Sequence, residues 1–353
     1  MVQERKYHKF IATLRSSSGQ PACLAVMLGA LLWFTMPAPA RAQDLRYSQW
    51  HASQTSVNPA FAGAYGDLRV SLNFRDQWPD MPQSYISYRA AGDGYLEAIR
   101  SGLGVSIDQD VQGDGLLRST QLGMCYMYQA RLSHHWALNL GASLDYTQFR
   151  INWQDVQFYD QISLLTGFND ASGNPNPTGE MVPAGEFDFM DVGIGLLLYS
   201  DKLYAGLSFN HVNTPSFSFY GSQSSSLPGS IGAQAGVFLG GKREKDLLLN
   251  PYALWTLQAG FNQLQTGIYL KKSLMLGGLA FKHNTAALSD VVIMAGLAKG
   301  MVRFGYSYDL STGPLSGLTG GAHEVSLLLT FRENPGKAQK NSQKSMLDCP
   351  SVL

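Results

Sequence analysis

The strongest constraint in this sequence is a long-range alternation of apolar and polar side chains. In residues 67–75, apolar side chains occupy every second position, with charged or small polar ones between them. The same pattern recurs in 136–147, 202–211 and 302–310. Successive side chains of a β-strand point to opposite faces, so each segment predicts a strand with one apolar and one polar or glycine face.

A soluble β-sandwich and a membrane β-barrel both produce this alternation, and three features favour the barrel. The segments run for about ten residues, the length of a tilted transmembrane strand, whereas soluble strands centre on five or six. The polar faces are rich in Gly, Ser, Asn and Asp, as expected of a crowded or wet lumen. Aromatic residues near the segment ends are expected to form interfacial girdles: Tyr126, Tyr128, Trp136, Tyr146, Tyr199 and Tyr204.

The sequence therefore predicts an all-β fold, a transmembrane antiparallel β-barrel of about 14 strands. No run of roughly 20 apolar residues follows residue 42, which argues against membrane-spanning helices. Short connections are expected on the periplasmic side, and longer ones outside, at 76–82, 151–185, 212–228 and 312–321. The predicted strands are 67–75, 83–90, 102–110, 116–132, 135–150, 186–199, 202–211, 229–240, 247–258, 262–271, 273–283, 289–299, 302–311 and 322–332.

The first 42 residues have the pattern of a secretory signal peptide. A basic stretch precedes an apolar run from Ala22 to Met36, and small residues at Ala40 and Ala42 form a cleavage site. We therefore expect four parts in the chain. They are a signal peptide (1–42), a plug-like N-terminal segment on the periplasmic side (43–66), the barrel (67–332) and a flexible periplasmic tail (333–353).

Several function classes are disfavoured by composition. Removing 1–42 takes five of 26 basic residues and one of 26 acidic residues, which leaves 21 − 25 = −4 and no basic block. We therefore expect no nucleic-acid partner. Neither CxxC nor HExxH occurs, and no motif joins a histidine to an activated serine. The sequence thus predicts no cofactor, no metal and no catalysis, with His211 and His283 as polar rim residues.

Short motifs spread along the chain resemble the PorP/SprF family. The opening QDLRYSQW and the box VNPAFAG are similar to the start of family members, and RDQWP is similar to their motif at the end of the first strand. Their order along the chain is more specific than any one motif. The segments that carry the resemblance are 43–50, 57–63, 75–79, 108–115, 277–282, 304–310, 320–327 and 349–350.

That resemblance implies a role that composition alone does not. PorP/SprF proteins are outer-membrane barrels of the Bacteroidetes type IX secretion and gliding apparatus. The resemblance implies location in the cell outer membrane, in contact with its lipid. It also implies partnership with periplasmic ring or peptidoglycan-binding components, and with a secreted surface protein that carries a type IX sorting domain. The alternative is an outer-membrane porin or solute channel.

Aromatic residues mark two candidate sites for plugging or partner binding. The N-terminal segment is expected to pack in the barrel mouth or lumen, the alternative being a poorly ordered leader. Its candidate residues are Tyr47, Trp50, Asn58, Pro59 and Phe61. The loop 151–185, with Trp153, Phe158 and Tyr159, is expected to be either a lumen-folded constriction or a partner-binding surface, unless it is a disordered decoration.

Six charged residues fall on the polar face of their predicted strands. Opposite charges inside a barrel should pair across the lumen, because a midplane arginine facing lipid costs about 2–4 kcal/mol. These residues are Arg69, Arg75, Asp145, Arg303, Asp309 and Glu324.

Overall fold

The computed structural model describes residues 44–153, 156–181, 184–219, 225–240, 246–284, 287–313 and 316–331. The predicted signal peptide (1–42) and tail (333–353) lie outside these ranges. Within them, no helix has the length and hydropathy needed to cross a bilayer.

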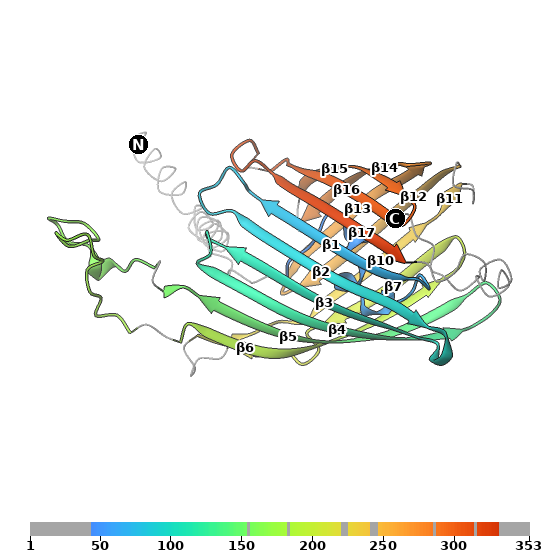
Figure 1. Cartoon of the computed structure of the whole chain (residues 1–353), viewed down its shortest axis with the longest axis horizontal. Helices are drawn as coiled ribbons and strands as arrows, with labels where there is room; N and C mark the ends of the chain where they lie inside the picture. Colours follow the sequence, from blue (N-terminus) through green and yellow to red (C-terminus); the bar gives the residue numbers. More distant parts are fainter. Residues whose placement is uncertain are drawn as a thin grey trace, which may run out of the picture. The chain divides into compact units, whose positions relative to one another are not determined.

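Fourteen long antiparallel strands form one closed barrel, as the sequence predicts (Figure 1). Neighbours along the chain pair with each other, and β1 pairs with β17 to close the ring. The strands are β1 (Leu68–Gln77), β2 (Tyr85–Leu96), β3 (Ser101–Gln112), β4 (Leu117–Arg131), β5 (Ala137–Ile151), β6 (Glu186–Tyr199), β7 (Leu203–Asn210), β10 (Ser230–Val237), β12 (Leu247–Gln258), β13 (Phe261–Lys272), β14 (Met275–Asn284), β15 (Ala287–Lys299), β16 (Val302–Ser311) and β17 (Ala322–Phe331).

Short elements complete the described fold. Strands β8 (Ser216–Phe217) and β9 (Ser225–Ser226) pair with each other, and β11 (Leu239–Gly240) pairs with β12. The short helices are η1 (Trp50–Ala52), α3 (Gln54–Val57), η2 (Pro59–Phe61), η3 (Glu97–Ile99) and η5 (Tyr159–Gln161). Three of these, η1, α3 and η2, belong to the N-terminal segment, which the figure shows in blue inside the ring of strands (Figure 1).

The alternation read from the sequence sorts side chains between the outer wall and the lumen. In β5, Leu140 and Leu144 face outward, whereas Asn139 points inward and is fully buried. An outward apolar wall suits lipid, and ring closure gives the strand backbones hydrogen-bond partners without exposed edges. The same amino-acid pattern therefore satisfies the bilayer outside and a polar interior.

The prediction of an interfacial position is wrong for two of the aromatic residues. Tyr199 and Tyr204 point into the lumen and are almost completely buried, whereas Tyr126, Tyr128 and Tyr146 face outward. Tyr199 and Tyr204 are paired across β6 and β7, where they pack in the cluster formed around the N-terminal segment. A strand-end tyrosine can serve as an interfacial anchor or as lumen packing, and which one applies depends on its face.

The barrel has two distinct ends. We call one the loop end, since it carries the connections 78–84, 113–116, 152–185, 211–229, 259–260, 285–286 and 312–321. The other is the turn end, with connections 97–100, 132–136, 200–202, 238–246, 273–274 and 300–301. The three longest connections are at the loop end, which matches the short-turn, long-loop asymmetry of outer-membrane barrels.

Replacing Leu144 by Arg should destabilise the barrel by about 2–4 kcal/mol, because it places a charge on the lipid face near the middle of β5. The urea concentration at the midpoint of unfolding should fall. It can be measured from the intensity of the folded band on SDS gels of unheated samples. Leu318→Arg is the matched control, since Leu318 lies exposed in a loop and should tolerate the charge. Equal losses in both variants would contradict a lipid-facing Leu144.

Candidate functional site

The N-terminal segment, residues 44–66, crosses the lumen from the loop end to the turn end. At the loop end, Asp44 contacts His211, just after β7, and Gln258, the last residue of β12. At the turn end, the backbone amide of Gly63 donates to Asp93. Gly63 packs against Gly94 and Gly102 so closely that a Cβ would lie 2.6 Å from the Gly94 carbonyl oxygen. The lumen is therefore occupied along its length.

One buried carboxylate holds the start of this segment. The Ser48 and Gln49 amides donate to the two Glu324 carboxylate oxygens at 2.7 and 3.0 Å. The Gln49 side chain also donates to the Glu324 carbonyl oxygen and accepts from Ser326. Glu324 is completely buried. An ionised carboxylate buried in this way must be fully hydrogen-bonded and paired, so the segment supplies part of what the barrel wall requires.

Two cations balance the acids around Ser48. Arg75 donates to Glu324 at 3.1 Å and to Asp309 at 2.9 Å, and Lys282 donates to Asp309 at 2.8 Å. Arg75 and Lys282 also donate to the Ser48 hydroxyl, which in turn donates to Asp309. The charges therefore cancel in a cluster drawn from β1, β14, β16 and β17, with a serine of the segment at its centre.

Asn58 fixes the middle of the segment. Its side-chain amide donates to the carbonyl oxygens of Leu196 and Leu207, at 3.0 and 3.1 Å, on neighbouring strands. Its side-chain oxygen accepts from the Ala60 amide and caps η2, which begins at Pro59. Asn139 donates to the Ala60 carbonyl oxygen. The Asn-Pro pair is thus a helix cap and a wall contact at once.

Glycines of the wall make room for this turn. A Cβ at Gly195 would overlap the Asn58 side chain, and one at Gly141 would overlap the Ala60 backbone. A Cβ at Gly102 would overlap the Ala62 carbonyl oxygen. These inward-facing glycines therefore allow backbone-level contact between the wall and the segment.

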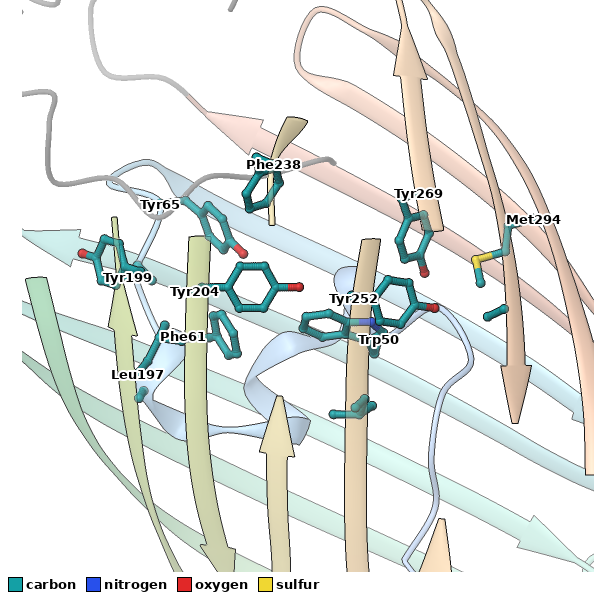
Figure 2. Close-up of a cluster of buried hydrophobic side chains, with 14 of the residues drawn as sticks. Trp50, Phe61, Tyr65, Leu197, Tyr199, Tyr204, Phe238, Tyr252, Tyr269 and Met294 are labelled. Carbon is teal, nitrogen blue, oxygen red and sulfur yellow. The ribbon is translucent and has the colours of Figure 1, made fainter. Parts of the chain in front are cut away.

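Aromatic side chains fill the rest of this region (Figure 2). Trp50 lies 5.6 Å from Tyr252 and 6.1 Å from both Phe61 and Tyr204, between ring centroids. Trp50 and Phe61 are each 1% exposed. This degree of burial is that of a packed protein core, so the segment is an integral part of the barrel interior.

A second charged cluster holds the loop end of the segment. The two ring nitrogens of His211 lie 2.9 Å from Asp44 and 2.6 Å from Asp191. Burial favours the neutral imidazole, but hydrogen bonds and charge from both acids outweigh it and raise the pKa of His211 to about 10. Burial also opposes ionisation of Asp44, yet His211 keeps the pKa of that carboxyl below its usual value. His211 is thus not the simple rim residue that the sequence suggested.

The other predicted lumen charges occupy different places. Arg69 pairs with Asp93 at 3.0 Å and donates to Gln54 of the segment. Arg303 donates to Thr330, and Asp145 hydrogen-bonds with Gln121 and Ser143. The structure therefore joins Arg69, Arg75, Asp309 and Glu324 to the segment, and Arg303 and Asp145 contact residues of the wall.

The described residues of the loop 151–185, which we call the aromatic loop, lie outside the lumen. Trp153 packs against Phe158 and against Phe219 of the neighbouring loop, with ring centroids 6.4 and 6.5 Å apart. Tyr159 is 89% exposed. Figure 1 shows this loop extending beyond β5 and β6, away from the barrel. Its geometry is therefore that of an external surface and not of a lumen constriction.

Sequence reasoning missed several residues that hold the segment. Ser48, Gln49 and Lys282 carry no distinctive motif chemistry, and His211 was assigned to the rim. Ser48 and Gln49 do belong to the QDLRYSQW motif, which was a usable signal. The wall glycines were visible on the polar faces of their strands, but only the structure shows what approaches them.

Comparison with known proteins gives one family and a general fold likeness. The profile of a family described as type IX secretion system membrane protein PorP/SprF matches residues 40–329. No curated protein matches the chain. Solved structures similar to it include the Ralstonia pickettii toluene transporter TbuX, with 10% identity, TM-score 0.45, and coverage of 80% of this chain and 94% of that one. The Acinetobacter baumannii outer membrane protein Omp33 is also similar, with 9% identity, TM-score 0.44, and coverage of 77% of this chain and 100% of that one.

Replacing Gly195 by Leu should displace the segment, since the new side chain would occupy the place of Asn58. Overpacking of this kind costs about 1–3 kcal/mol. We expect faster trypsin cleavage after Arg46, measured by mass spectrometry of the intact protein. Gly92→Ala is the control, because the nearest atom to a Cβ there is 3.6 Å away. Unchanged cleavage in Gly195→Leu would contradict the close contact.

His211 should remain protonated well above neutral pH and titrate near pH 10, as followed by NMR of the imidazole nitrogens. Its folded pKa lies above the ordinary value of about 6.5. The stabilisation it contributes is therefore complete below pH 6.5 and is lost as pH rises through about 10. Asp44→Asn should lower this pKa. A wild-type titration near 6.5 would show that the Asp44–His211–Asp191 cluster does not form.

Proposed function

The chain belongs to the PorP/SprF family of type IX secretion system membrane proteins, and we propose that it is a sealed outer-membrane anchor for a secreted surface protein. In this role it binds and positions its partner without catalysis. Support of export, surface attachment or gliding would follow from that binding.

The observation that carries this proposal is the occupied lumen. Three contacts with the wall fix the segment. Near its start the Ser48 amide donates to Glu324, in its middle the Asn58 side chain donates to the Leu196 carbonyl oxygen, and near its end the Gly63 amide donates to Asp93. Moving it would leave a buried Glu324 and Asp309 without several hydrogen bonds, at a cost of a few kcal/mol for an unsatisfied charged group. A segment held by contacts along its length favours a structural role for the barrel over passage of a substrate through it.

The two ends of the barrel suit different partners. The loop end offers long connections and the aromatic loop, which suit a surface protein. The turn end, expected to be periplasmic, suits the ring and peptidoglycan-binding components. A porin or solute channel is the competing function, and it requires an open lumen.

Purified wild-type protein in planar bilayers should give no steady ion conductance, because the segment fills the lumen. Deletion of residues 44–62 should produce discrete conductance steps if the barrel still assembles, which cold denaturing gels would show. Leu318→Ser is a matched control at the loop end that leaves the segment intact, and it should remain closed. Steady porin-like currents from the wild type would favour the channel function instead.

A further inference from the structure

The external loop carries a compact unit, residues 156–181, which we call the arm. Ser163 and Gly167 exchange backbone hydrogen bonds, and Asn176 donates to the carbonyl oxygens of Gln161 and Gly167. The Asp160 carboxylate accepts from the Thr178 hydroxyl and the Gly179 amide. These contacts pre-organise the arm, which lowers the entropy cost of binding a partner through it.

The arm exposes large apolar side chains. Leu164, Leu165 and Met181 are 103%, 95% and 92% exposed, and Tyr159 is 89% exposed. The two leucines stand at the turn closed by Ser163 and Gly167. Isolated exposed leucines are common, but two adjacent, fully exposed leucines on an ordered turn form an apolar tip that can serve as an aliphatic anchor in a pocket of a partner.

The charge of the region has one sign. No Lys, Arg or His occurs from residue 151 to residue 201. The arm itself carries Asp160, Asp170 and Glu180. An acidic surface with an apolar tip is complementary to a basic surface with an apolar pocket, and such complementarity speeds association and selects partners.

Aromatic packing braces the base of the arm against the next loop. Phe187 stacks on Phe217 with ring centroids 5.6 Å apart and meets Phe219 edge-on at 4.5 Å. Phe149 stacks on Phe187 at 5.0 Å. The strand ends on either side of the arm are therefore packed against the next loop, and the arm projects beyond the barrel end (Figure 1). This position favours a protein partner over the bilayer, whose anionic headgroups its acidic side chains would also repel.

We propose that the arm docks into an apolar pocket with a basic rim on the secreted surface protein. Leu164 and Leu165 enter the pocket, while Asp170 and Glu180 face the basic rim. This inference rests on the proposed anchoring function and assigns it a site.

The test uses whole cells first and purified full-length protein second. The surface protein that is lost from cells lacking this chain serves as the probe, in purified form, for binding to the barrel in nanodiscs. The double substitution Leu164→Ser with Leu165→Ser should weaken binding tenfold to a hundredfold, since it removes the two side chains that the partner's pocket would bury. Leu318→Ser, at an exposed leucine of another loop at the same end, should bind as the wild type does.

Charge is tested separately. Glu180→Lys should weaken binding severalfold, mainly through slower association, and the difference from the wild type should shrink as salt is raised. The arm proposal is overturned if the probe binds the double serine variant as tightly as the wild type. If no surface protein is lost from cells lacking the chain, the anchoring function fails, and the arm proposal with it. Quenching of a Leu165→Trp variant by brominated lipids, above the wild-type signal, would place the tip in the bilayer and also overturn the proposal.

Discussion

The buried carboxylate of Glu324 is the constraint on which the interior of this barrel depends. It accepts from the Ser48 and Gln49 amides and pairs with Arg75 at 3.1 Å. A charge buried without partners costs several kcal/mol, so the wall is complete only when the segment is in place. Ser48 belongs to a part of the chain that precedes every strand, yet it is joined to β14, β16 and β17 near the C-terminal end. The two ends of the folded chain therefore stabilise one cluster.

Steric fit adds to this electrostatic requirement. The inward faces of β5 and β6 carry Gly141 and Gly195 where the Asn58–Ala60 turn makes contact. Where the segment presents Trp50, β7 and β12 carry the bulky side chains of Tyr204 and Tyr252. Small and large wall residues thus mirror the shape of the segment. Cores of this density tolerate volume changes poorly, so the wall and the segment must match as one packed unit.

Much of the fold was predictable, because the lipid and the lumen impose opposite demands on alternate side chains of each strand. All fourteen strands followed from that pattern, whereas the contents of the lumen did not, because alternation shows only that a face is not lipid-exposed. For this reason the predicted interfacial positions of Tyr199 and Tyr204 were wrong. The hydrogen bond from the Ser48 amide to Glu324 could not be predicted, since the two residues lie 276 positions apart and only ring closure brings them together. The acidic bias of the aromatic loop, in contrast, can be read directly from the sequence.

The segment and the arm use their polar groups in opposite ways. Ser48, Gln49 and Asn58 direct their hydrogen bonds to the barrel wall, whereas Asp160 and Asn176 direct theirs back into the arm. The segment consequently contributes to barrel stability. Among the described residues, the tip of the arm bonds to Ser163 of the arm itself, so it can change without loss of a barrel hydrogen bond. Such a division lets substitutions in the exposed arm leave the packed interior unchanged, as is common for surface loops carried on a rigid scaffold.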